Sequence, residues 1–551
     1  MKKIHVDKKG SVILQGNPEK KSEAEGKRSS IKNISKVKVT EKVGLFRRML
    51  QTKNLKIDTS VVEKGLSLDL RWGSIKRKFE VLFPEEVWKE LPLDYKKAIV
   101  ENIAHLSSVE IGVMLNAKKI HYNTPLPLFK SFFIEVLLKC LLYSGDCDTG
   151  KTIKYITQLI NLETEFKGSP TSLDLRSLQT NEGSINTLTF GKESLLSFGL
   201  AQELGMNPVS VMVIEPDCDV MYRGQRIATF QNKHKYELIK RFEKEFNLHV
   251  YCIDSNLNDI PDYTLWDFDP TDLGWSAQLT QYIFLLLPFN YKFKQKYIVY
   301  GNEYSCNSYY YNKEGFKCHP VYDQTSDWMG QVNSMLQNVT GGGMQAISLV
   351  QPLHEIAVTK VLYQRYPQLA KYQMSCHCNN EGAIKSRWCG ACSKCARCFT
   401  FMKALGFDPA TVNLKDMFNL DSKPHFSIFN QSKDMCGYDS AGLGRDEQIF
   451  AFHLAAKRGA TGELIDLFKK EFGEEATRRE EEFRNEFFKL QRPANIPAPL
   501  WKKLKPIYEE ELKKDGNENT PKEVENISTP HNNLPKKSNS AASGENELLK
   551  N

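Results

Sequence analysis

The segment Ser184–Ser194, SINTLTFGKES, has the pattern of a strand that turns directly into a helix. A strand is expected up to Phe190, and a helical pattern runs from about Lys192 to Leu204. A strand–turn–helix unit of this kind places free backbone N–H groups and the positive end of a helix dipole at the carboxyl edge of a parallel sheet. Phosphate groups bind well at that position.

The residues of the turn suit phosphate binding. Gly191 permits close approach of the backbone, Lys192 supplies positive charge, and Thr189 and Ser194 supply hydroxyl groups. The spacing alone is weak support, since Gly-Lys-Glu-Ser also forms an ordinary helix start. The context of the segment therefore decides how it is interpreted.

Strands and helices alternate on the carboxyl side of this segment, which is typical of a parallel sheet with crossover helices. Strands are expected at Pro208–Ile214, Leu248–Asp254 and Tyr297–Tyr300, and helices at Lys233–Phe246, Trp275–Leu287 and Pro352–Tyr363. The sequence therefore predicts an α/β fold with a doubly wound parallel sheet.

Six of the 13 cysteines lie between Cys376 and Cys398, and C-x-x-C spacing favours metal ligation in a chain without an export signal. Four thiolates suit a tetrahedral structural zinc site with no open position for substrate. The predicted ligands are Cys376, Cys389, Cys392 and Cys395, with Cys378, His377 and Cys398 as spare candidates. An iron–sulfur cluster is the alternative metal centre, and a set of buried free thiols is the alternative without metal.

The charge of the chain is unevenly distributed. Of the net +8, residues 1–56 contribute +11, with 16 Lys and Arg against 5 Asp and Glu. The folded part is then close to neutral, so nucleic acid is not expected as a partner except through this basic leader, for which a solvated tail is the alternative. No apolar run approaches a membrane span, and Met1–Gly10 does not begin a signal peptide. A soluble, cytoplasmic protein without a membrane partner is expected.

The turn resembles the signature Ser-Gly-Gly-x-Asp-Ser/Thr of the PP-loop family of ATP pyrophosphatases. Thr189 stands at the first Ser, Gly191 at the second Gly, Glu193 at the Asp and Ser194 at the last position. Phe190 replaces the first Gly, which puts a side chain where the backbone ordinarily approaches phosphate. The resemblance implies a PP-loop (HUP-like) domain that binds ATP through Thr189–Ser194, with Mg²⁺.

The cysteine module also has relatives within that family. Ser375-Cys376, then Trp388–Cys395 and Ala404–Phe407, resemble the closing segment of 7-cyano-7-deazaguanine synthase and of the UDP-N-acetylmuramoyl-L-alanyl-L-glutamate epimerase family. Gly301–Ser305 and the flanking regions look closer to the epimerase, and the likeness covers about Arg71 to Leu500.

The resemblance implies an enzyme that uses ATP to adenylate a glutamyl carboxylate, releases pyrophosphate and then AMP, and epimerises the activated residue. The alternatives are a nucleobase-modifying enzyme like the deazaguanine synthase and a binding subunit without turnover. Glu303, just past a strand end, is the preferred site residue, as a magnesium or substrate contact. Asp254, His319, Asp327 and His354 are further acid/base candidates, each with a structural role as the alternative; Asp217 and Asp219 also suit ordinary loop positions.

Six regions are expected along the chain. They are a disordered basic leader (1–55), an N-terminal domain with a linker (56–182), the PP-loop ATP-binding domain (183–375), the zinc module (376–410), a helical region (411–514) and a disordered tail (515–551). The oligomeric state is left open.

Overall fold

The computed structural model describes residues 5–6, 12–13, 54–217, 219–222, 225–268, 271, 273, 278–376, 378, 380–430 and 442–514. The disorder predicted for the leader and for the tail falls on residues outside this set, with two exceptions. The paired strands β1 (His5–Val6) and β2 (Val12–Ile13) are described, and the last two leader residues, Asn54 and Leu55, begin strand β3 (Asn54–Val62). In the described part of the chain, no helix combines the length and apolarity that crossing a membrane requires.

Within the described residues, ten strands form one central sheet, in the order β16-β13-β8-β9-β12-β5-β4-β3-β6-β7. The first five are parallel to one another: β8 (Asn181–Thr187), β9 (Val209–Ile214), β12 (Val250–Ser255), β13 (Gln295–Tyr300) and β16 (Gln345–Ser348). In chain order this block runs 3-2-1-4-5, which is the strand order of a doubly wound sheet. The predicted α/β class is confirmed, with a sheet that is mostly parallel in this half.

The direction of winding reverses between β8 and β13, which are neighbours in the sheet. The chain crosses from β8 to β9 and β12 on one side and returns to β13 and β16 on the other. In open α/β sheets, ligands bind outside the carboxyl ends of the strands at such a switch point. The fold therefore marks the ends of β8 and β13 as the place to look for a site.

The sheet continues into the N-terminal part of the chain. Strand β5 (Ile75–Leu82) pairs antiparallel with β12 through Leu82 and Val81, and β4 (Gly65–Trp72) and β3 (Asn54–Val62) follow as antiparallel neighbours. Strands β6 (Lys119–Tyr122) and β7 (Glu163–Glu165) complete this edge. The boundary expected at residue 182 thus falls inside β8 (Asn181–Thr187), a strand of this same sheet.

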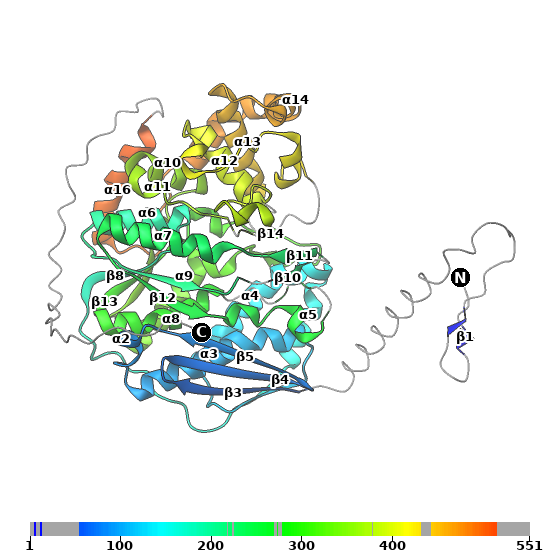
Figure 1. The fold of residues 1–551 in the computed structure, drawn as a ribbon, viewed down its shortest axis with the longest axis vertical. Coiled ribbons are helices and arrows are strands. Elements are labelled where there is room, and N and C mark those ends of the chain that lie inside the picture. The colour runs from blue at the N-terminus through cyan, green and yellow to red at the C-terminus, as the bar shows by residue number, and fades with distance from the viewer. Residues whose placement is uncertain are drawn as a thin grey trace, which may run out of the picture. The chain divides into compact units, whose positions relative to one another are not determined.

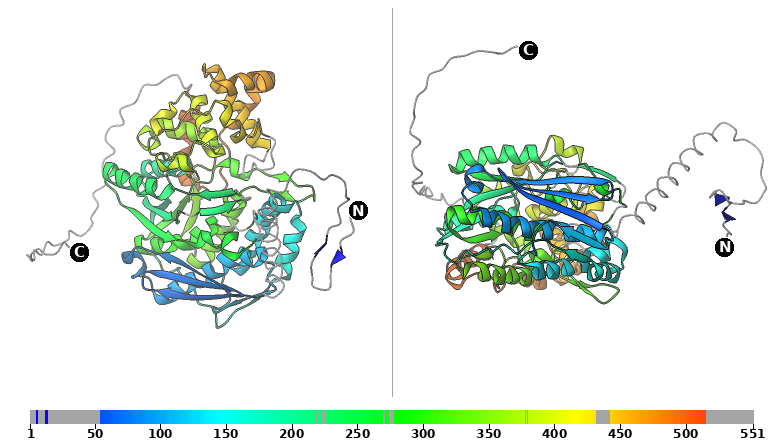
Figure 2. Two further views of the ribbon diagram at one scale, coloured as in Figure 1. Left: turned by 45° about the vertical axis from the view of Figure 1, so that its right-hand side comes forward. Right: turned by 90° about the horizontal axis from the view of Figure 1, so that it is seen from below.

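Helices cover both faces of the sheet and enclose two hydrophobic cores (Figures 1 and 2). One core contains side chains of α6 (Lys192–Glu203), α7 (Gln231–Phe246), α10 (Glu355–Arg365) and α11 (Pro367–Ala370). The other contains side chains of α2 (Glu85–Trp88), α3 (Leu93–Met114), α4 (Lys130–Thr149), α5 (Thr152–Asn161), α8 (Gln278–Phe293) and α9 (Ser326–Thr340). Two small hairpins, β10–β11 (Asp219–Tyr222, Gln225–Ala228) and β14–β15 (Tyr310–Tyr311, Lys317–Cys318), lie in the connections.

The carboxyl-terminal helices extend the first core. They are α12 (Ser393–Leu405), α13 (Gly442–Lys457), α14 (Glu463–Arg478), α15 (Glu480–Phe487) and α16 (Ala498–Lys513). Helix α16 is fastened to the loop after β16, because the buried Tyr508 hydroxyl donates to the Leu349 carbonyl. Arg365 of α10 also pairs with Glu511 at 2.9 Å. These carboxyl-terminal helices are thus packed onto the helical layer that contains α10.

Candidate functional site

The turn after β8 adopts the predicted strand–loop–helix geometry, with Gly191 as the N-cap of α6. The Thr189 N–H donates to Ser194 Oγ at 3.2 Å, and the Gly191 N–H donates to Thr189 Oγ1 at 3.3 Å. Ser194 Oγ in turn donates to the Gly191 carbonyl at 3.0 Å. The two hydroxyls therefore brace the turn, while the first turn of α6 points its N–H groups toward the carboxyl edge of the sheet.

Phe190 does not occupy the space in front of this turn, contrary to the expectation from the sequence. Its ring is fully buried and packs against Phe242 and Tyr372, with centroids 5.5 and 6.3 Å away. Its φ of 60° is the left-handed conformation that glycine adopts most easily. That backbone carries the side chain into the core, and the Phe190 carbonyl accepts a hydrogen bond from the Met374 N–H.

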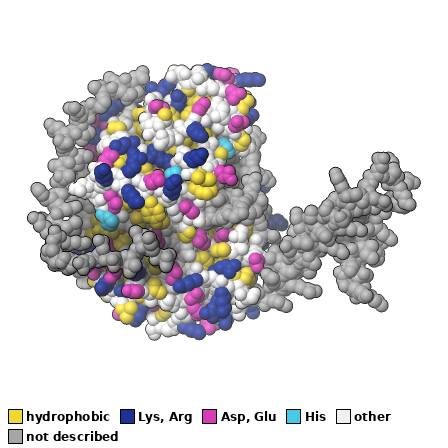
Figure 3. Space-filling model, viewed as in Figure 1, with side chains coloured by type: hydrophobic (Ala, Val, Ile, Leu, Met, Phe, Trp, Pro, Cys, Tyr) yellow, Lys and Arg dark blue, Asp and Glu magenta, His cyan; other side chains and the backbone are white. Residues whose placement is uncertain are grey.

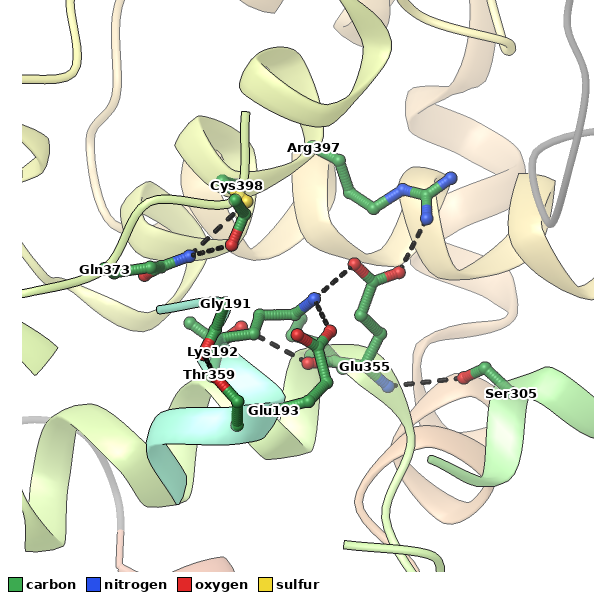
Figure 4. A network of polar contacts seen from close by, with 12 residues as sticks. Gly191, Lys192, Glu193, Ser305, Glu355, Thr359, Gln373, Arg397 and Cys398 are labelled. Atoms are coloured by element: carbon green, nitrogen blue, oxygen red, sulfur yellow. Dashed lines mark hydrogen bonds and ion pairs between the residues drawn. The ribbon is translucent and has the colours of Figure 1, made fainter. Parts of the chain in front are cut away.

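Lys192 is buried at the start of α6 and reaches two carboxylates (Figure 4). Its Nζ contacts Glu193 and lies 2.7 Å from Glu355 Oε1. Burial opposes the charge, but Glu193 and Glu355 raise the pKa of Lys192 well above its usual value. The side chain is therefore an ammonium group inside the protein, held by anions from α6 and α10.

Glu355, the first residue of α10, is clamped between two cations. Lys192 binds one carboxylate oxygen, and Arg397 Nη1 lies 2.7 Å from the other. Burial would raise the pKa of Glu355, but Arg397 and Lys192 together hold it at about 2. The Glu355 N–H also donates to Ser305 Oγ at 3.3 Å, which ties this helix start to the segment after β13.

Glu303 completes the group from the end of β13. One oxygen each of Glu193, Glu303 and Glu355 lie within 4.8 Å of one another, close enough to share a cation. Burial, and then the neighbouring Glu193, raise the pKa of Glu303 well above its ordinary value. Gly301 allows this approach, because a Cβ there would lie 2.7 Å from Glu193 Cβ.

This carboxylate cluster (Glu193, Glu303 and Glu355) lies at the switch point of the sheet, since its members follow β8, β13 and β16. Two cations face three carboxyl groups, so a fully ionised cluster has one excess negative charge in a partly buried place. Hard carboxylate oxygens are the ligands that Mg²⁺ prefers. The residues present therefore fit a divalent cation, which would replace the proton on Glu303.

The four predicted zinc ligands converge. The sulfur atoms of Cys376, Cys389, Cys392 and Cys395 lie within 4.8 Å of one another, and those of Cys389 and Cys395 are 3.8 Å apart. A tetrahedral zinc with Zn–S bonds of about 2.3 Å requires S···S distances of about 3.8 Å. The group is suited to holding a metal such as zinc.

Backbone N–H groups point at the same sulfurs, as expected for thiolate ligands. The N–H groups of Cys378 and Cys389 each lie 3.2 Å from Cys376 Sγ. The spare candidates Cys378 and Cys398 have other partners: Cys378 Sγ donates to the Arg387 carbonyl, and Cys398 Sγ accepts from Gln373 Nε2. The third spare candidate, His377, lies outside the described residues.

The cysteine group and the carboxylate cluster are joined by α12. Cys392 is the N-cap of this helix, Cys395 lies in its first turn, and Arg397 follows two residues later. Figure 4 shows Arg397 extending from α12 toward Glu355. A metal held by the cysteines would thus fix the helix that delivers the Arg397 guanidinium to the cluster.

Of the other acid/base candidates, His354 adjoins the carboxylate cluster, whereas His319 and Asp327 have contacts of their own. His354 is fully buried and directly precedes Glu355; its Nδ1 lies 3.2 Å from Ser305 Oγ, and burial lowers its pKa to about 4. His319 packs against Tyr309 and Tyr322, and Asp327 accepts the Tyr322 hydroxyl.

The aspartates after β9 and β12 have simpler surroundings. Asp217 caps α7, because its carboxylate accepts a hydrogen bond from the Gln231 N–H at 2.9 Å. This contact supports a structural role for Asp217 rather than a catalytic one. Asp219 lies in β10. Asp254, near the end of β12, has an exposed side chain. Neighbouring atoms nevertheless remove part of the water around its carboxyl group, and this desolvation raises its pKa.

Three members of the site, Arg397, Ser305 and Glu355, had no predicted role. Arg397 lies inside the C-x-x-C run, where the cysteine spacing dominates the pattern. Ser305 ends the segment Gly301–Ser305, in which Glu303 alone was assigned a function, and Glu355 lies in the helix expected at Pro352–Tyr363, which was assigned none.

No protein-family model matches the chain, and no curated protein or solved structure is significantly similar to it.

Proposed function

We propose that the chain binds ATP with Mg²⁺ at the switch point and adenylates a carboxylate, forming AMP and pyrophosphate. One observation carries the proposal. The N-terminus of α6, just after β8, lies beside the carboxylate cluster, to which Glu193 of this helix, Glu303 and Glu355 contribute. An N-terminus at this edge suits the phosphates, and the cluster suits their cation.

In this reaction an oxygen of the substrate carboxylate attacks the α-phosphorus of ATP. A new O–P bond forms as the bond between the α-phosphorus and the bridging oxygen to the β-phosphate breaks, and pyrophosphate leaves. Glu193, Glu303 and Glu355 would hold Mg²⁺, which neutralises charge on the phosphates. The N–H groups of the first turn of α6 and the Lys192 ammonium add positive potential at the same place.

We further propose that the carboxylate belongs to the glutamyl residue of a UDP-N-acetylmuramoyl-dipeptide-like substrate, which is epimerised after activation. This finer assignment rests on the sequence resemblance. The acyl adenylate acidifies the adjacent Cα–H; a base removes this proton, and an acid returns one to the other face. Water then attacks the acyl carbon, the bond from that carbon to the AMP oxygen breaks, and AMP and the free carboxylate leave. A deazaguanine synthase-like reaction begins with the same adenylation and ends in a nitrile.

A third function, binding without turnover, is favoured by one observation. The Lys192 ammonium already lies among the carboxylates and pairs with Glu193 and Glu355. A lysine in this position can neutralise the carboxylates in place of a metal ion. The protein would then serve as a binding subunit without turnover.

Carboxylate-dependent exchange of labelled pyrophosphate into ATP tests the adenylation directly. We expect exchange with the dipeptide substrate, and its loss in Glu303→Gln, with Asp408→Asn on the exposed surface as the matched control. An epimerised dipeptide identifies the epimerase reaction, and a nitrile identifies the alternative. ATP binding without exchange for either substrate class would contradict the proposed adenylation and favour the binding subunit.

A further inference from the structure

Helix α7 presents a row of cations to solvent. Lys233, Lys240, Arg241 and Lys244 are exposed, at spacings of seven, one and three residues that keep them on one side of the helix. Glu237 is the exposed anion within this row. Figure 3 shows Lys and Arg side chains gathered over the part of this face where Figure 1 places α7.

The row continues onto the segment that leads into the cysteine module. The Tyr372 hydroxyl donates to the Arg241 carbonyl at 3.2 Å, and the guanidinium of Arg241 and the ammonium of Lys371 lie 5.6 and 5.5 Å from the Tyr372 ring centroid. Near the other end of α7, His234 Nε2 lies 2.6 Å from the Ala383 carbonyl, two residues before the exposed Lys385.

We define the basic face as these six cations: Lys233, Lys240, Arg241, Lys244, Lys371 and Lys385. Two of them are partly offset by the Glu245 carboxylate: Lys371 Nζ lies 2.6 Å from it, and Arg241 interacts with it electrostatically.

The folded part of the chain is close to neutral in total, but its charges are unevenly distributed. Residues 231–249 carry five Lys and Arg against three Glu, and residues 371–397 carry five against one, a net of +6. With +11 in residues 1–56 and +8 in total, all the remaining residues sum to −9. These two segments, which contact each other, therefore carry a net positive charge, whereas the remaining residues together are net negative.

An exposed aromatic ring lies within the row. Tyr236 is 42% exposed, three residues after Lys233 and four before Lys240. Cations that follow a phosphate backbone, combined with aromatic rings on which bases stack, are the features by which proteins hold single strands. We propose that the basic face binds the phosphodiester backbone of single-stranded nucleic acid, with Tyr236 as a stacking platform.

The layout of the face favours a nucleic acid over an acidic protein. Helix α7 is about 24 Å long, and its cations are spread along that length rather than gathered around one pocket. A single strand offers evenly spaced anions over such a distance and an unpaired base for Tyr236. An acidic protein segment would match the charges but leave the exposed ring without a role.

Binding of fluorescein-labelled oligo(U) and oligo(dT) to the full-length protein, followed by anisotropy, tests the proposal. Lys240→Glu combined with Lys244→Glu is expected to weaken binding at least about tenfold at about 50 mM salt. Loss of two phosphate contacts is also expected to reduce the slope of log K against log salt by about 1.4. The matched control is Lys469→Glu with Lys470→Glu, which reverses two exposed charges on α14.

The stacking role has its own variant. Tyr236→Ala is expected to weaken single-strand binding at least about fivefold, whereas Tyr236→Phe retains it. Unchanged affinity in the α7 double variant would overturn the proposal and assign any binding to the basic leader. Equal affinity for duplex, or competition by polyglutamate as effective as that by RNA of equal charge, would also overturn it, the latter in favour of an acidic protein partner.

Discussion

Replacing Lys192 with methionine removes one charge from the carboxylate cluster while nearly preserving side-chain volume. Lys192 is 3% exposed and Glu355 is 6% exposed, so the substitution leaves buried carboxylates without one of their two cations. Breaking a buried ion pair from one side costs about 3–5 kcal/mol. We expect the free energy of unfolding of Lys192→Met to fall by about this amount in magnesium-free buffer.

Magnesium should restore part of the loss, because the variant cluster lacks the ammonium that competes for its oxygens. A ligand at 100 times its Kd stabilises the folded state by about 2.7 kcal/mol. Urea unfolding with and without MgCl₂, followed by tryptophan fluorescence, measures both effects. Chelators are left out of the buffer so that metal bound by the cysteines stays in place.

The control for this experiment is Lys505→Met, which breaks an exposed pair with Glu509 and should cost less than about 1 kcal/mol. If Lys192→Met were no more destabilising than Lys505→Met, the charges of the cluster would not be coupled to the fold as described. If magnesium did not stabilise Lys192→Met, the carboxylates would not form a cation site.

Three further outcomes follow from the site. Cys392→Ser should lower the metal content to well below one ion per chain by mass spectrometry, whereas Cys378→Ser should leave it unchanged; equal loss in both would refute the ligand set. Because the pKa of Glu303 is raised, its protonated form contributes stability that is complete below the ordinary value of 4.5 and is lost as pH rises. Glu303→Gln should therefore gain stability relative to wild type above that pH, as urea unfolding at several pH values would show, and a gain at low pH instead would contradict the shift. Phe190→Gly relieves about 1–2 kcal/mol of left-handed strain but removes a fully buried ring worth about 3–5 kcal/mol, so net destabilisation is expected in the same assay, and a stabilised variant would refute it.

Local patterns predicted much of the fold. The strand and helix around Thr189–Ser194 follow from hydrophobic periodicity and a turn within one segment. The convergence of four cysteines suited to holding a metal follows from C-x-x-C spacing. Most helix and strand positions of the parallel half agree with expectation to within a few residues, as at β9 and α7. Strand β16 and helix α9 were not predicted.

Contacts between distant segments could not be predicted in the same way. Glu355 meets Lys192 across 163 residues and Arg397 across 42, and no pattern within either segment encodes that meeting. The pairing of β5 with β12, which makes one sheet of two expected regions, also depends on tertiary packing. The direction of the Phe190 side chain depends on a single backbone angle that the sequence does not specify.

The central claim is that the carboxylate cluster at the switch point holds the magnesium of a bound ATP. Isothermal titration of the full-length protein with ATP, in magnesium and in magnesium-free buffer, tests it most directly because it needs no second substrate. The account predicts magnesium-dependent binding that Glu303→Gln weakens at least tenfold, a loss of about 1.4 kcal/mol. Absence of ATP binding, or binding that neither magnesium nor Glu303→Gln alters, would contradict it.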